Sequence, residues 1–321
     1  MTTSGSYDFS QTRNTLVARA FRIMGVIKSG ETLGSQEVTD ASEALNAMVK
    51  RWSGTPGMHV WTTQEATLFP QASQASYSLA TNGADHCTLS YAATDLAADA
   101  ASGATSISVS SISGLANGDH IGVVMADGSL HWTTINGSPS GTTVVLTAAL
   151  TEAALSDAAV FAYTTKIVRP LRIAQREGAV RRYSIASGLE TPIGPPIARE
   201  DYNLLSKKMQ TGTINQVFYD PQLSTGYLYL WNPPTTVTNL IKFTCHRPIQ
   251  DFDSAADNPD LPQEWIDVIV WGLADALCPE YDVPAERADR ITRRAEAYLD
   301  AVAGFDREAE SILFQADAGP G

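Results

Sequence analysis

The stretch from residue 66 to residue 165 contains no lysine or arginine and is dominated by serine, threonine, glycine and alanine. Within it, short runs of apolar or alternating residues are separated by Asp-Gly and Asn-Gly pairs, a pattern typical of strands joined by tight turns. We expect strands at 105–111, 119–128, 130–137, 142–150 and 158–165. The stretch therefore predicts a small β-sandwich or barrel that is inserted into the chain as a module.

Helical periodicity is found on both sides of this module. At 10–27 and again at 35–52, apolar residues recur every three or four positions, so two short antiparallel helices are expected. Beyond the module, 262–277 begins with proline and acidic residues, as a helix N-terminus does. A further helix is expected at about 284–303, so the sequence predicts a helix pair near each end of the chain.

Three more segments have the composition of strands: 215–219, 226–231 and 240–245. Together with the helices, they predict an α+β fold. An α-helical core with small β elements is expected from 1–65 and 166–303, and the inserted all-β domain from 66–165. Residues 304–321 are expected to form an extended C-terminal tail, because they are too few and too rich in glycine and alanine to fold alone.

The net charge is −13, from 22 lysines and arginines and 35 acidic residues. An acidic protein does not attract the DNA phosphate backbone at long range, which argues against sequence-specific DNA binding. The charge is unevenly divided, because 166–247 has eleven bases and five acids whereas 248–321 has five bases and seventeen acids. Opposite charges on separate segments of one chain suit head-to-tail contacts between copies in a ring.

The basic segment 166–210 allows two interpretations. We expect five of its arginines to face the acidic end of a neighbouring copy: Arg169, Arg172, Arg176, Arg181 and Arg182. Because Tyr183 and Tyr202 lie among these basic residues and could stack on nucleobases, a DNA-binding module stays open as an alternative. Duplex binding that falls steeply with salt would favour that alternative.

No catalytic or cofactor motif is present in the sequence. It contains no GxGxxG, Walker A, HExxH or GxSxG pattern, and its five histidines are scattered. We therefore expect no enzyme activity, no cofactor and no resident metal ion.

Two groups of acidic residues leave alternatives open. Glu264 and Asp267 lie three residues apart at a helix start and could be the acid and base of a cell-wall hydrolase, although the helix dipole also explains them. The acidic loop at 251–260 could hold a hard cation such as Ca²⁺, although it lacks the spacing of a calcium-binding loop.

The cysteines and the N-terminal residues bear on where the protein is made. Cys87, Cys245 and Cys278 are odd in number and have no metal-ligand spacing, which favours buried thiols or a reducing compartment. The first residues lack the basic and apolar segments of a secretory leader, and no apolar run approaches the ~18 residues of a membrane span. We expect a protein that is made in the cytoplasm and does not contact a membrane.

Four segments carry a family resemblance, in this order along the chain: EALNAMVKRW (43–52), DPQ (220–222), GYLYLWNPP (226–234) and DLPQEWIDVIVWGLADALCPEYDVP (260–284). On these segments the chain resembles the head-to-tail adaptor proteins of short-tailed bacteriophages, also called tail accessory or packaged-DNA stabilisation proteins. The resemblance covers 11–69 and about 166–303. The most compact members of that family have a much shorter connection in place of the module at 66–165.

The resemblance implies a structural protein at the head-tail junction of a virion. It implies a ring, expected to have twelve copies, that binds beneath the portal protein after packaging, extends the DNA channel and retains the DNA. Tail nozzle or tailspike proteins would dock below it, and the β module is expected to face outward, away from the DNA. The main alternative from another class is a virion-associated peptidoglycan hydrolase that uses Glu264 and Asp267.

Two sets of residues follow from that implied role. The C-terminal segment would reach up along the portal, and its apolar anchors would be Phe305, Ile312, Leu313 and Phe314. Acidic side chains in the channel would repel phosphates and let a duplex slide past, and we expect four residues to include such side chains: Asp282, Glu286, Asp289 and Glu296.

Overall fold

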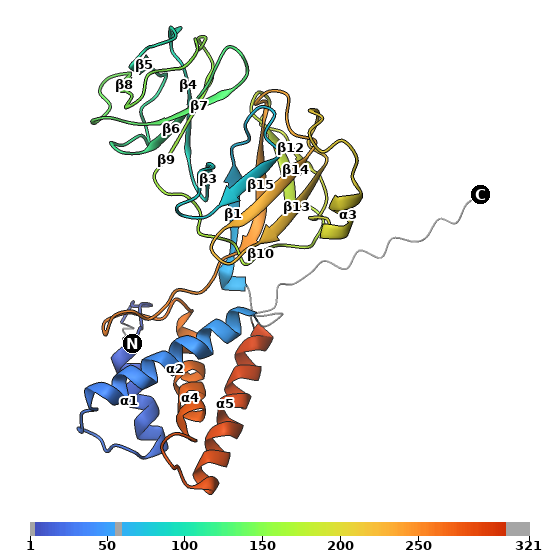
Figure 1. Cartoon of the computed structure of the whole chain (residues 1–321). Coiled ribbons are helices and arrows are strands. Elements are labelled where there is room, and N and C mark those ends of the chain that lie inside the picture. Colours follow the sequence, from blue (N-terminus) through green and yellow to red (C-terminus); the bar gives the residue numbers. More distant parts are fainter. Residues whose placement is uncertain (1–3, 55–59, 306–321) are drawn as a thin grey trace. The chain divides into compact units, whose positions relative to one another are not determined.

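The computed structural model describes residues 4–54 and 60–305 of the chain (Figure 1). The chain divides into two compact units, a helical unit formed by residues 1–62 and 248–321 and a β unit formed by residues 63–247. Both ends of the sequence therefore contribute to the same unit. No helix in the described part of the chain is long and apolar enough to cross a membrane.

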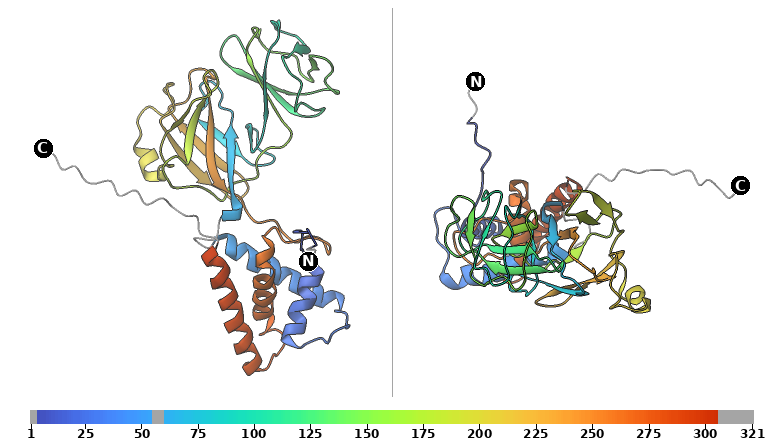
Figure 2. Two further views of the ribbon diagram at one scale, coloured as in Figure 1. Left: turned by 180° about the vertical axis from the view of Figure 1, so that it is seen from behind. Right: turned by 90° about the horizontal axis from the view of Figure 1, so that it is seen from above.

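The centre of the helical unit is α4 (Ile266–Leu277), which is apolar on most of its surface. Three helices pack against it: α1 (Arg13–Met24), α2 (Ser35–Gly54) and α5 (Ala285–Phe305). In Figures 1 and 2, α5 runs alongside α4. Burial of apolar side chains such as Leu16, Leu45 and Leu273, each fully removed from solvent, stabilises this packing.

Aromatic rings close the end of the helical unit where the two short 3-10 turns lie, η1 (Val60–Thr62) and η2 (Gln263–Trp265). The ring centroid of Trp265 is 4.6 Å from that of Trp61 and 5.4 Å from that of Trp52 on α2. At the other side, α1 ends at Gly25, whose left-handed φ of 77° lets its N–H bond back to the last helical carbonyls. Local sequence signals thus set where these helices begin and end.

A two-layer antiparallel sandwich forms the part of the β unit nearest to the helical segments in sequence. One sheet contains β12 (Glu190–Pro192), β11 (Val180–Ser184), β15 (Asn239–His246), β1 (Thr63–Leu68) and β3 (Cys87–Thr88), with β10 (Arg172–Ile173) also paired to β15. The other contains β13 (Gln216–Pro221), β14 (Gly226–Trp231) and β2 (Ser76–Leu79). Alternate side chains of both sheets, including Phe243, Tyr77 and Leu228, form a common core. The short helix α3 (Arg199–Leu204) lies against β13.

A second set of strands in the β unit has its own apolar core. The four-stranded sheet contains β4 (Ala92–Asp95), β9 (Ala159–Tyr163), β6 (His120–Val124) and β7 (Leu130–Thr134), and a two-stranded sheet contains β5 (Ser106–Ser108) and β8 (Thr143–Val145). Buried residues from Leu96 to Ala162 form this core. An aromatic cluster around Phe69, Phe161 and Tyr163 joins it to the sandwich.

The expected α+β class is confirmed, because the chain contains both helices and several antiparallel sheets. The five strands expected in the module are all present, each shorter than the apolar run that indicated it, and both expected helix pairs occur. The three cysteines are free and buried. Burial raises the pKa of all three thiols.

The division of the chain differs from the expected one in the assignment of residues 166–247. We expected them in the helical core, but they belong to the β unit. The physical reason is strand pairing: β15 pairs with β1 from Thr63↔His246 to Leu68↔Ile241, and β14 pairs with β2 at Leu228↔Tyr77. These backbone ladders hold the two flanks of the module together as one sandwich.

Candidate functional site

The outward face of α5 carries two parallel stripes of exposed side chains. The acidic stripe consists of Glu286, Asp289, Arg293, Glu296 and Asp300. The arginine stripe consists of Arg287, Arg290, Arg294, Ala297 and Ala301. In both stripes the members are spaced alternately by three and four residues, which places them in line on one side of a helix.

The opposite face of α5 fixes the direction in which these stripes point. Ile291 is buried, and Tyr298, Leu299 and Val302 pack against the same core as α4. The hydroxyl of Thr292 donates a hydrogen bond to Asp275 on α4. Because a helix has 3.6 residues per turn, packing this face inward leaves both stripes outside the core of the unit.

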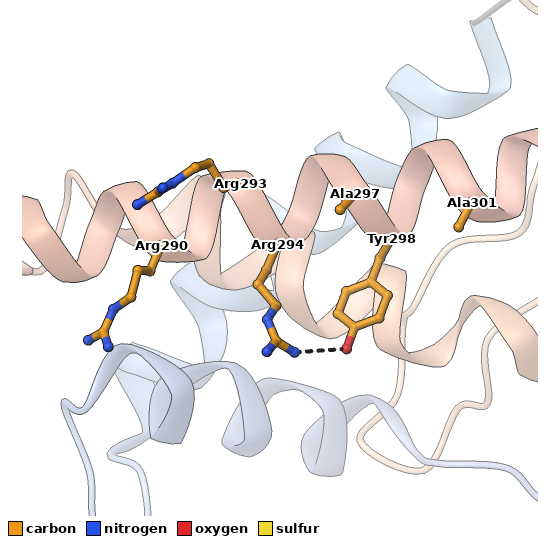
Figure 3. Close-up of a pocket in the computed structure, with 6 residues that line it drawn as sticks. All are labelled: Arg290, Arg293, Arg294, Ala297, Tyr298 and Ala301. Carbon is orange, nitrogen blue, oxygen red and sulfur yellow. Dashed lines mark hydrogen bonds between the residues drawn. The ribbon is translucent and has the colours of Figure 1, made fainter.

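The arginine stripe borders a hollow of about 720 Å³, lined by Arg290, Arg293, Arg294, Ala297, Tyr298 and Ala301 (Figure 3). Nη1 of Arg294 donates a hydrogen bond to the hydroxyl of Tyr298 over 3.2 Å. The guanidinium of Arg294 also lies 5.5 Å from the ring centre of Trp271, within the range of a cation–π interaction. The two alanines contribute only methyl groups, which leaves the hollow open.

Within residues 4–54 and 60–305, the charges of both stripes have no ionic partner. Among the ion pairs of the described residues, none includes a side chain of α5. Arg287 donates to the backbone oxygen of Met24 and Arg293 to that of Asp289, so these two are bonded to carbonyls and not to carboxylates. A strongly charged helix face without internal pairs is available for an external partner.

The four acids expected near a channel are all exposed. Glu286, Asp289 and Glu296 belong to the acidic stripe, whereas Asp282 lies in the turn before α5, with a positive φ of 48°. The residues that the sequence interpretation did not single out are Asp300 and the arginine stripe. A sequence pattern could have identified these residues, because residues of like charge recur along α5 at alternating intervals of three and four positions.

The five arginines expected on a surface between copies do not form one free patch. Arg181 pairs with Glu65 and, at 2.7 Å, with Glu190, so it belongs to a network inside the β unit. Arg172 is exposed, and the other three are partly buried. Arg172, Arg181 and Arg182 lie in strands of the sandwich, where successive side chains point to opposite faces of the sheet.

The acidic loop at 251–260 uses its carboxylates locally. Asp251 pairs with Lys50 at 2.6 Å, Asp257 accepts a hydrogen bond from the Ser254 N–H at 2.5 Å, and Asp260 accepts one from the Gln250 N–H at 3.0 Å. In the described ranges, no three His, Cys, Asp or Glu residues are grouped so that they could hold a metal ion. These turns and the Lys50–Asp251 ion pair stabilise the loop.

The two candidate carboxylates of the hydrolase alternative have different surroundings. Asp267, in the first turn of α4, pairs with Arg19 of α1 at 2.9 Å and so links two helices. Glu264 lies in η2 and is exposed. Of the expected portal anchors, Ile312, Leu313 and Phe314 lie outside the described residues, and Phe305 is the last residue of α5, with a side chain that is not described.

The comparisons with known proteins give little similarity. No protein-family model matches the chain, and no curated protein matches it. Among solved structures, 23% of this chain is similar to 14% of the chain of the Gp54 tailspike of Acinetobacter baumannii bacteriophage AP22, in complex with A. baumannii capsular saccharide. The sequence identity is 19% and the TM-score is 0.21, so this similarity covers too little of either chain to assign a fold or a function.

Proposed function

We propose that the protein is a head-to-tail adaptor of a short-tailed bacteriophage, a ring subunit that lies beneath the portal protein, extends the DNA channel and retains the packaged DNA. The sequence resemblance at 43–52, 220–234 and 260–284 supports this proposal. The observation that carries it is the outward face of α5, where eight of ten exposed stripe residues are charged and none forms an ion pair with another described residue. Such a face fits a subunit that neighbouring copies complete.

The charge distribution supports a role that encloses DNA without binding a particular sequence. The segment 248–321, which includes α4 and α5, has seventeen acids and five bases. In a ring around a duplex, an exposed acid outside the two stripes, Asp282, repels the phosphates and reduces adhesion of the DNA to the wall.

The proposed partners are the portal protein above the ring and tail nozzle or tailspike proteins below it. The tail at 304–321 is proposed to bind the portal through Phe305, Ile312, Leu313 and Phe314, because apolar side chains on a short terminal segment can be buried on a partner. The ring is proposed to have twelve copies, and the module with the core around Ile121 to face away from the DNA.

Native mass spectrometry of the full chain with the portal protein of the same phage tests this function. We expect the portal ring to gain a whole number of adaptor copies, twelve being the proposed number. A quadruple variant with serine at Phe305, Ile312, Leu313 and Phe314 is expected to keep the wild-type melting temperature and to lose at least tenfold in portal affinity. A wild-type protein that stays monomeric and adds no mass to the portal would overturn the proposal.

A further inference from the structure

The two stripes of α5 are complementary in charge. The acidic stripe has four carboxylates and one arginine, whereas the arginine stripe has three arginines and no acid. Each position of the arginine stripe follows a position of the acidic stripe by one residue, so the two stripes lie about 100° apart around the same helix. They therefore point outward in different directions and can each contact a different neighbour.

Within one subunit these opposite charges are not brought together. Glu286 and Arg290 lie four residues apart, as do Asp289 and Arg293, yet neither pair is within ion-pair distance. Both stripes remain exposed to solvent. A second copy whose acidic stripe lies along the arginine stripe would supply the missing partners.

We propose that α5 forms the contact between neighbouring copies, with the arginine stripe of one copy bound to the acidic stripe of the next. This inference rests on the proposed function, because it assigns the surface through which the ring is built. The two stripes are different surfaces, so the contact is heterologous and repeats head to tail until the ring closes.

The hollow beside the arginine stripe fits such a neighbour. Ala297 and Ala301 leave space of about 720 Å³ where longer side chains of an approaching helix can enter. Carboxylates that enter there come close to Arg290 and Arg294 (Figure 3). Arg294 is already held by the Tyr298 hydroxyl and the Trp271 ring, so less side-chain freedom is lost when it binds a carboxylate.

The proposed contact also divides the four acids that were expected near a channel between two surfaces, the contact with the next copy and the channel wall. Glu286, Asp289 and Glu296 belong to the acidic stripe and face the next copy. Asp282 lies in the turn before α5, outside both stripes, and stays available to the channel wall.

Charge reversal on one stripe at a time tests this contact. The acidic-stripe variant is Asp289→Lys with Glu296→Lys, and the arginine-stripe variant is Arg290→Glu with Arg294→Glu. Each full-length variant is measured by mass photometry with the portal protein present, alone and in an equimolar mixture. We expect each variant alone to lose at least tenfold in ring assembly, because like charges then face each other. The mixture is expected to assemble, because every contact again joins opposite charges.

Control variants separate this effect from a general effect of charge or folding. Glu43→Lys on α2 and Arg22→Glu on α1 reverse exposed charges of the same helical unit away from α5, and both are expected to assemble like the wild type. If Arg294→Glu lowers the melting temperature, Arg290→Glu with Ala297→Glu replaces it, since neither residue has a bonded side chain in the described part of the chain.

The outcomes distinguish this contact from the function on which it rests. Variants and mixture that all assemble like the wild type overturn the stripe contact alone. A mixture that stops at pairs of copies overturns the head-to-tail arrangement. A wild-type chain that adds no mass to the portal overturns the proposed function and the ring contact with it.

Discussion

Arg181 belongs to a network of ion pairs that links several strands of the β unit. It lies on β11, pairs with Glu65 of β1 and is 2.7 Å from Glu190 of β12. Lys242 of β15 is 2.7 Å from the same Glu190, and its hydrogen bond lowers the pKa of that carboxyl group. The side chains of Arg181 and Lys242 are only 19% and 18% exposed, whereas those of Glu65 and Glu190 are 52% and 36% exposed.

We predict that Arg181→Met lowers the free energy of unfolding of the β unit by about 1–3 kcal/mol, because the mostly buried guanidinium that bonds Glu65 and Glu190 is lost. Arg172→Met is the control: the exposed side chain of this arginine has no hydrogen bond or ion pair to the described residues, and its loss is expected to change stability by less than about 0.5 kcal/mol. Chemical denaturation followed by circular dichroism measures both. Equal effects of the two substitutions would contradict the internal role of Arg181.

At the scale of elements, the β13–β14 hairpin depends on a close approach between Gly226 and Tyr219. A Cβ atom added at Gly226 would lie 2.1 Å from the Tyr219 hydroxyl and 2.6 Å from its ring. Tyr219 is buried, and its hydroxyl donates a hydrogen bond to the Pro170 carbonyl at 2.5 Å. The ring therefore has no free space into which it can move.

We predict that Gly226→Ala destabilises the β unit by about 1–3 kcal/mol through this steric overlap. In a Tyr219→Leu background, where the ring is absent, the same substitution is expected to cost less than about 0.5 kcal/mol. Gly212→Ala is the matched control, since its added Cβ meets Asn232 at an ordinary 3.5 Å. Differential scanning calorimetry of the four proteins measures the coupling, and purely additive effects would rule out the overlap.

The elements that could be predicted from the sequence are those with a long periodic pattern. The 3-4 spacing of apolar residues gave α1, α2, α4 and α5 to within a few residues, and turn pairs separated the strands of the module. Strands of two to four residues, such as β2, β3 and β10, carry no readable period. The pairing of β1 with β15 joins residues about 180 positions apart, and no local pattern encodes it.

The candidate site was predictable in part for the same reason. Glu286, Asp289 and Glu296 were singled out as acids of the last helix, and all are exposed. That Arg287, Arg290 and Arg294 form a second stripe depends on which face of α5 packs against α4. The ion pairing of Arg181 depends on strand register, which the sequence does not specify.

At the scale of the whole molecule, the β unit begins and ends on paired strands. Thr63, where it starts, lies opposite His246, one residue before its end. Such partners in an antiparallel ladder are about 5 Å apart, so the two ends of the unit are fixed to each other independently of any other residues.

We predict that a fragment of residues 63–247 folds alone, because its strands and apolar cores are complete within that range. Calorimetry is expected to show a cooperative transition for the fragment that matches one transition of the full chain. A fragment of 92–247, which lacks β1, β2 and β3 but keeps the core of β4 to β9, is the control and is expected to lose the unfolding transition of the sandwich. A non-cooperative 63–247 fragment would contradict the division into two units.

The division into a discontinuous helical unit and a continuous β unit sets the order in which the parts of the chain can fold during translation. The apolar faces of α1 and α2 pack against α4, which is translated about 200 residues after α2. At roughly 5–20 residues per second, the first two helices wait about 10–40 s for that partner while the β unit emerges and folds. During synthesis the exposed apolar faces of the N-terminal helices are therefore expected to bind chaperones, although the finished protein buries these faces in its core.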